Sequence, residues 1–67
     1  RFDLAEKNYK NAIFLKPNSW EAHGNLGTLY YFANKLKLAK FHLKRSIEYG
    51  NLNSSIPELA KILEHKN

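Results

Sequence analysis

Cysteine is absent from the sequence, which excludes a disulfide framework and any zinc site built on thiolates. The longest uninterrupted apolar run covers only residues 29–33, far short of the ~20 residues that a membrane-spanning helix needs. No signal peptide is visible, and the chain opens on Arg1 rather than on methionine. We therefore expect no membrane insertion, and we interpret the 67 residues as part of a longer chain. The lack of cysteine favours a reducing compartment such as the cytoplasm, but the localisation stays unknown.

Catalytic motifs are absent as well. The sequence has neither a nucleophile elbow nor a glycine-rich loop that could cradle phosphate, and its carboxylates are expected on separate elements. The three histidines, His23, His42 and His65, show no metal-ligand spacing. We predict no catalytic residue, no cofactor and no metal, and hence no enzyme. His23 is expected to fill space between two helices.

Acidic residues are scarce, since 6 Asp and Glu stand against 11 Lys and Arg, giving a net charge of +5. A basic chain attracts acidic partners of any kind, whether peptide, nucleic acid or membrane surface. Five basic residues fall in one predicted helix: Lys35, Lys37, Lys40, Lys44 and Arg45. This run could dock an acidic partner, but we favour a solvated outer face, which is the usual role of such runs in repeat proteins.

Apolar residues recur at helical spacing around two loops, residues 16–19 and 50–55. We predict four helices near residues 2–15, 19–33, 35–49 and 55–66, and no strand. Pro17 ends the first helix, Asn18 resembles the N-cap of the second, and Ser55 that of the fourth. Asn34 and Gly50 are suited to the left-handed turns that end helices. The apolar stripe of the third helix is expected to comprise Leu36, Ala39, Leu43 and Ile47.

An internal repeat links the first predicted helix to the third and the second to the fourth. Four pairs of identical residues lie 34 positions apart: Leu4 and Leu38, Ala5 and Ala39, Lys10 and Lys44, Ile13 and Ile47. Three pairs of similar size lie 33 positions apart: Leu26 and Leu59, Gly27 and Ala60, Leu29 and Ile62. A period of this length with two helices per unit is typical of stacked helical repeats.

The pattern resembles the tetratricopeptide repeat (TPR) family. The central unit has Leu26-Gly27 and Tyr30 on its first helix and small or apolar residues on its second, namely Ala39, Leu43 and Ser46. The upstream unit supplies Ala5, Tyr9, Ala12 and Pro17. The sequence departs from the family pattern at three positions: His23 stands where Trp is frequent, Leu43 replaces an aromatic residue and Asn51 replaces the closing Pro.

The resemblance implies an all-α fold in which antiparallel helix-turn-helix units stack as an α-solenoid. Residues 1–19 would hold the second helix of a partial unit, residues 20–53 a complete unit, and residues 54–67 the first helix of a following unit or a capping helix. Gly27 would face Ala39 so that the two helices of one unit approach closely. The helices at both ends would lack a neighbour, so Leu4, Ile13 or Phe14 should expose apolar surface, and self-association through these open ends is expected.

In TPR proteins the first helix of each unit lines a concave groove that receives a peptide or a partner helix. The resemblance therefore places a binding surface on the outward face of the second helix, which includes Gly24. Pro57, Glu58 and Lys61 would extend this surface onto the fourth helix. The expected partner-binding residues are Glu21, Asn25, Thr28, Tyr31, Phe32 and Lys61. We favour Asn25 because an amide both donates and accepts hydrogen bonds, with a solvated surface Asn as the alternative. For Tyr31 and Phe32 we expect partial burial rather than free contact anchors.

The resulting hypothesis is a scaffold segment that presents a groove to a protein or peptide partner, which the net charge suggests is acidic. One alternative is a nucleic-acid-binding helical repeat that uses the basic surface. The groove positions are not basic, which argues against nucleic acid. A second alternative is a TPR arm attached to a larger enzyme.

Overall fold

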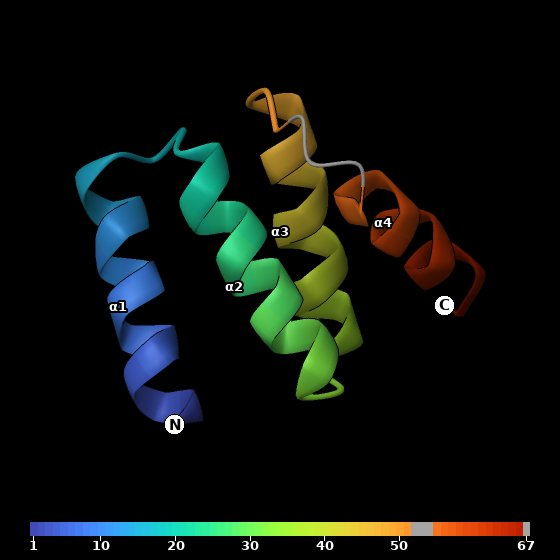
Figure 1. Cartoon of the computed structure of the whole chain (residues 1–67), viewed down its shortest axis with the longest axis horizontal. Coiled ribbons are helices and arrows are strands. Elements are labelled where there is room, and N and C mark those ends of the chain that lie inside the picture. Colours follow the sequence, from blue (N-terminus) through green and yellow to red (C-terminus); the bar gives the residue numbers. More distant parts are fainter. Residues whose placement is uncertain (52–54, 67) are drawn as a thin grey trace.

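The computed structural model describes residues 1–51 and 55–66, and within these ranges all regular structure is helical. The four helices are α1 (Phe2–Leu15), α2 (Trp20–Phe32), α3 (Leu36–Glu48) and α4 (Ser55–Lys66) (Figure 1). The prediction of an all-α chain with four helices is confirmed, with each helix end within one residue of the predicted position. The predicted unit boundary at residue 53 lies outside the described residues.

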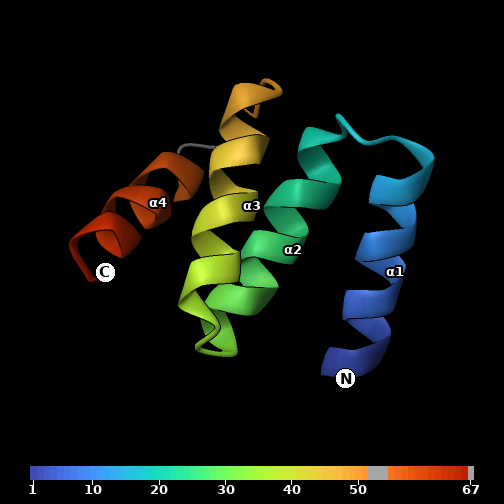
Figure 2. The ribbon, with the colours of Figure 1, turned by 180° about the vertical axis from the view of Figure 1, so that it is seen from behind.

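Each helix packs on its neighbour in the sequence, α1 on α2, α2 on α3 and α3 on α4. Figures 1 and 2 show the four helices side by side in chain order, with successive helices running in opposite directions and the two termini at opposite ends of the row. The whole chain measures 31 × 25 × 15 Å along its principal axes. α3 therefore lies between α2 and α4 in this row of helices.

The connection between α1 and α2 depends on a proline and a serine. Lys16, which precedes Pro17, leaves the helical region with φ −142° and ψ 89°, so α1 ends at Leu15 as predicted. Ser19 caps α2, since its Oγ accepts a hydrogen bond from the backbone N–H of Ala22 at 3.2 Å. The predicted cap at Asn18 is wrong by one position, because two neighbouring cap-forming residues give the same sequence signal. Ser55, the predicted cap of α4, is the first residue of that helix, and its side chain is not among those described.

α2 and α3 end in the same way, with a residue at positive φ. Asn34 has φ 62°, and the N–H groups of Asn34 and Lys35 donate to the carbonyls of Tyr31 and Tyr30. Gly50 has φ 104°, and its N–H and that of Asn51 donate to the equivalent carbonyls of α3, those of Ile47 and Ser46. Both ends are Schellman motifs, which satisfy helix carbonyls that would otherwise lack donors. The predicted roles of Asn34 and Gly50 are confirmed.

Replacing Asn34 by valine is expected to lower the free energy of unfolding by about 1–2 kcal/mol, because a β-branched residue is strained in the left-handed region. Asn34→Gly removes the same side chain without that strain and serves as the control, with stability at or slightly above that of the parent chain. Urea unfolding followed by circular dichroism measures both. Equal stability of the valine and glycine variants would contradict this account of the turn.

The buried core joins α2, α3 and α4. Its members are Leu26, Tyr30, Ala39, Leu43, Ile56, Ala60 and Leu63. α1 contains no fully buried residue and covers the core with half-buried side chains, among them Phe2, Tyr9 and Ile13. The packing of Leu59, predicted from the repeat, lies outside the described side chains.

One detail of the predicted packing is wrong. Ile47 is exposed, and Ser46 beside it is fully buried, because the Ser46 hydroxyl donates to the Trp20 carbonyl and so turns position 46 of α3 toward α2. The nearest neighbour of Gly27 is Leu43: a Cβ added at Gly27 would lie 2.8 Å from the Cγ of Leu43 and 3.0 Å from its backbone nitrogen. α2 and α3 therefore approach closely at Gly27, while its pairing with Ala39, which is fully buried, stays a prediction.

Apolar side chains on α1 face solvent, as predicted for an open end. Leu4, Phe14 and Leu15 are exposed, while Ile13 is half-buried against the core. The exposure of Leu4 and Phe14 is confirmed. Self-association through this surface stays a prediction.

Candidate functional site

A groove with a volume of about 860 Å³ runs along the outward face of α2. Its lining residues come from α1, α2, the end of the α3 turn and α4: Tyr9, Trp20, Glu21, Gly24, Asn25, Thr28, Leu29, Phe32, Asn51, Ile56, Glu58 and Ile62. No residue of α3 itself contributes to this lining, although α3 stands between α2 and α4. We call this feature the α2 groove.

Four of the six sequence-predicted binding residues line the α2 groove. Glu21, Asn25, Thr28 and Phe32 follow one another at intervals of three or four residues, which places them on one face of α2. Asn25 and Glu21 are exposed and Thr28 is half-buried. Phe32 is 79% exposed, so the expected partial burial of this ring is wrong. Phe32 is the last residue of α2, beyond the reach of the core.

The other two predicted residues lie elsewhere. Tyr31 is half-buried, and its ring packs edge-on against that of Phe32 with centroids 5.4 Å apart. Lys61 lines a separate cavity of about 480 Å³ between α3 and α4, together with Lys44 and Glu64. The six residues thus do not form one surface. The direction of Lys61 depends on the rotation of α4, which is set by how Ala60 and Leu63 pack into the core and which the sequence alone does not reveal.

Sequence reasoning missed the apolar part of the groove. Trp20 and Ile62 are each 40% exposed and face it from α2 and α4. A usable signal was present, since Trp20, Gly24 and Thr28 are four residues apart on the face already singled out. Gly24 was expected to be outward but is buried, because a Cβ there would lie 2.9 Å from Asn51 Nδ2 and 3.0 Å from Ser46 Oγ. It therefore lies at the groove floor, under the α3 turn.

A buried chain of hydrogen bonds holds the Trp20 end of the groove. The side-chain amide of Asn51 donates to Ser46 Oγ at 2.7 Å, and the Ser46 hydroxyl donates to the Trp20 carbonyl at 2.7 Å. Asn51 occupies the position where the repeat pattern has its closing proline. Because this amide ties the turn after α3 to the start of α2, Trp20 has a fixed place at the groove edge.

A second polar contact ties α1 to α2. The Tyr30 hydroxyl donates to the Glu6 carboxylate at 2.6 Å, and Glu6 also pairs with Lys10 at 3.4 Å. Burial, followed by the bond to Glu6, raises the pKa of Tyr30 to about 12. The same hydrogen bond, aided by Lys10, lowers the pKa of Glu6. Tyr9, the only groove residue on α1, depends on this attachment for its position.

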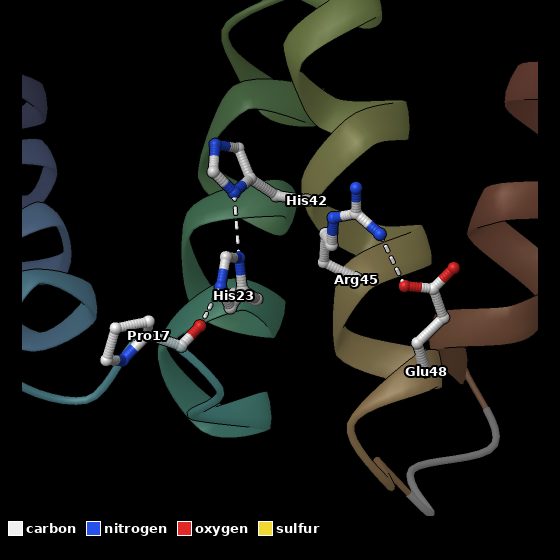
Figure 3. Close-up of polar contacts among 5 residues, drawn as sticks. All are labelled: Pro17, His23, His42, Arg45 and Glu48. Atoms are coloured by element: carbon white, nitrogen blue, oxygen red, sulfur yellow. Dashed lines mark hydrogen bonds and ion pairs between the residues drawn. The ribbon is translucent and has the colours of Figure 1, made fainter.

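Two histidines that are 19 positions apart meet between α2 and α3. The Nδ1 atoms of His23 and His42 are 3.0 Å apart, and His23 Nε2 is 2.9 Å from the Pro17 carbonyl (Figure 3). A carbonyl only accepts, so Nε2 of His23 carries its proton, Nδ1 of neutral His23 accepts, and His42 Nδ1–H donates. Burial, then the charges of His23 and Lys10, lower the pKa of His42 to about 4.

His23 is 5% exposed and fills the interhelical position predicted for it. The contact between His23 and His42 was not predicted, because contacts between helices are not visible as local spacing in the sequence. Among the described residues, no group of three or more histidines, cysteines and carboxylates is placed to hold a metal ion. None of the helices in residues 1–51 and 55–66 has the length and apolar character needed to cross a membrane.

The basic residues of α3 are partly engaged within the chain. Lys44 pairs with Glu64 of α4 at 2.8 Å, and Arg45 pairs with Glu48 at 2.6 Å (Figure 3). The Arg45 guanidinium also lies 5.1 Å from the centre of the Phe41 ring. These contacts place part of the positive charge on an outer face, away from the groove lining.

Comparisons with protein-family models, with curated proteins and with solved structures find no match to this chain. A functional proposal therefore has to rest on the geometry of the α2 groove and on the repeat pattern.

Proposed function

We propose that this chain is a TPR-like interaction module that binds a segment of a partner protein in the α2 groove. The observation that carries the proposal is the exposure of large apolar side chains along one continuous hollow. Trp20, Phe32 and Ile62 leave 40%, 79% and 40% of their surface open there. Large aromatic residues in a concave site are the usual anchors of protein recognition.

The polar groups of the groove suit a peptide ligand. Asn25 is exposed beside the apolar side chains, and its amide can donate to and accept from a peptide backbone. Thr28 adds a hydroxyl on the same face one turn later. A volume of about 860 Å³ lies within the range of sites that enclose several side chains.

The repeat supports a stacked architecture of the TPR kind. Gly27 and Ala60 are 33 positions apart, and both are buried. The repeat pattern has a small residue at this position of each unit. α2 and α3 end in the same turn motif. Neighbouring units of such a solenoid align their first helices on one side, and α2 and α4 supply 10 of the 12 residues that line the groove.

The nucleic-acid alternative has less support. In the part of the chain that the structure describes, neither Lys nor Arg lines the α2 groove, and two basic residues of α3 are paired with carboxylates. Phosphate recognition depends on clusters of such cations. A protein segment is therefore the ligand that we propose.

Phe32→Ala is expected to weaken binding of groove ligands by roughly 30-fold, the effect of losing one buried aromatic anchor. Ligands would be selected from a random peptide library displayed on phage, and their affinities measured by calorimetry. Phe14→Ala is the matched control, because Phe14 is 83% exposed on α1 but does not line the groove. Selected peptides that bind the two variants equally well would refute the assignment of the α2 groove as the docking site.

A further inference from the structure

The charges in the α2 groove are opposite in sign to the net charge of the chain. Among the described residues, its charged lining consists of Glu21 and Glu58, without Lys, Arg or His. The chain as a whole carries +5. A groove in such a chain is expected by composition alone to be basic, so the acidic lining is a feature of this site and not of the composition.

Glu21 and Glu58 also differ from other acidic residues in their partners. Glu6, Glu48 and Glu64 each form an ion pair with a Lys or Arg of the chain. Within residues 1–51 and 55–66, neither groove carboxylate takes part in an ion pair, and both are exposed. The two carboxylates are thus open to a cation from outside the chain.

The carboxylates and the aromatic anchor occupy different ends of the groove. Glu21 lies in the first turn of α2 and Glu58 in the first turn of α4, and both helices run downward from the upper side of the row in Figure 1. Phe32 is the last residue of α2. Eleven residues of helix separate Glu21 from Phe32, which is roughly 17 Å along the axis. The groove therefore has an acidic end, which also contains Trp20, and an uncharged end at Phe32.

We propose that the α2 groove binds a basic amphipathic segment of a partner protein. Lysine or arginine side chains of the segment meet Glu21 and Glu58, and a large apolar side chain packs on Phe32, roughly 17 Å away or about five residues of extended chain. This inference rests on the function proposed above and names the class of partner. It replaces the acidic partner expected from the net charge.

The positive charge of the rest of the chain does not prevent this binding. At physiological salt the Debye length is about 8 Å, so exposed charges farther away than this are largely screened. The cations of α3 do not line the groove, and Lys44 and Arg45 are paired with Glu64 and Glu48. Glu58 lies at the border of the groove, because it also lines the cavity between α3 and α4 that contains Lys44 and Lys61. Among the described residues that line the groove itself, Glu21 and Glu58 are the charged ones.

Two synthetic peptides test the inference, one built from Leu and Lys and one with Glu at every Lys position. Trp20 is the only tryptophan of the chain and lines the groove, so its fluorescence reports occupancy. In 0.15 M salt we expect the Leu/Lys peptide to bind roughly ten-fold or more tightly than the Leu/Glu peptide. The double variant Glu21→Gln, Glu58→Gln should weaken binding of the Leu/Lys peptide by roughly 2- to 30-fold, the range for two exposed ion pairs.

The matched control is Glu48→Gln, Glu64→Gln, which raises the net charge by the same amount outside the α2 groove. This variant should keep most of the affinity for the Leu/Lys peptide, and an equal loss in both double variants would overturn the inference. Because Glu21 and Glu58 also lie in first turns, where carboxylates stabilise helices, thermal melting of each variant separates that role from binding. A double variant that melts earlier but binds the Leu/Lys peptide as before would likewise overturn it.

Further outcomes separate this inference from the proposed function. Equal binding of both peptides, weakened by Phe32→Ala, would overturn the preference for a basic segment while leaving the groove as a docking site. No response of Trp20 to either peptide would overturn both. A Trp20 response to chain concentration alone, lost in the Glu21→Gln, Glu58→Gln variant, would assign the groove to a second copy of the chain and overturn the partner inference.

Discussion

Gly27→Val is expected to remove most of the stability of this chain, about 3 kcal/mol or more, at the upper end of the cost of overpacking. The added Cβ alone would lie 2.8 Å from Cγ and Cδ2 of Leu43 and 3.0 Å from its backbone nitrogen. The side chain of Leu43 is fully buried and cannot turn away into solvent, and the backbone nitrogen moves only if α3 moves as a whole. A core this small supplies little stability in reserve.

Thermal and urea unfolding of the variant, followed by circular dichroism, measures the effect. Asn25→Val is the matched control, because it places the same β-branched residue in the same helix at an exposed position. Its cost should be limited to helix propensity, within about 0.7 kcal/mol. A melting temperature of Gly27→Val within a few degrees of the control would show that α2 and α3 do not approach closely at this point.

Acidification from pH 7 to pH 5 is expected to destabilise the chain, with His42 as the cause. Its pKa falls from the ordinary 6.5 to about 4 in the folded state. Between pH 6.5 and about pH 4, the unfolded chain therefore binds a proton at His42 that the folded chain does not bind. The stabilising effect is complete above pH 6.5 and is lost progressively as the pH falls toward 4. After discounting for the partial exposure of His42, we expect about 1–2 kcal/mol over the whole window.

The charged and titratable groups around His42 come from two other helices. Lys10 of α1 and His23 of α2 disfavour its protonation, and the ring of Tyr30 lies 5.8 Å away. Glu6, whose pKa is lowered from 4.5, loses its own stabilising effect only below that pH. Unfolding free energies measured between pH 5 and 7 therefore exclude the contribution of Glu6.

His42→Asn tests this assignment, since its amide nitrogen can still donate toward His23 but does not titrate. The slope of unfolding free energy against pH should largely disappear in this variant. His65→Asn removes an exposed histidine of α4 and should leave the slope unchanged. A slope that persists in His42→Asn at the parent value would contradict the role assigned to His42.

The sequence predicts the local structure well because each signal is local. Pro17, Asn34 and Gly50 act on their own backbone, and the structure has a helix end or turn at each. The repeat also located small buried residues such as Gly27 and Ala39. These features follow from which conformations a residue tolerates, whatever packs around it.

Contacts between helices are where prediction from sequence fails. The meeting of His23 with His42, the exposure of Ile47 and the position of Lys61 all depend on how far each helix is rotated against its neighbour. One residue of rotation is about 100°, which exchanges a buried position for an exposed one.

No residue of α1 is fully buried, so α1 is expected to resist local unfolding less than α2 and α3 do. Detaching α1 exposes its own half-buried side chains and the side of the core at Tyr30, and it breaks the bond between Tyr30 and Glu6. Separating α2 from α3 exposes the centre of the core. Local unfolding is cheapest where least apolar surface is buried. The α2 side of the groove is therefore expected to resist local unfolding, and the Tyr9 side, on α1, to move more easily. We expect the groove to accept ligands of different size by a displacement of α1.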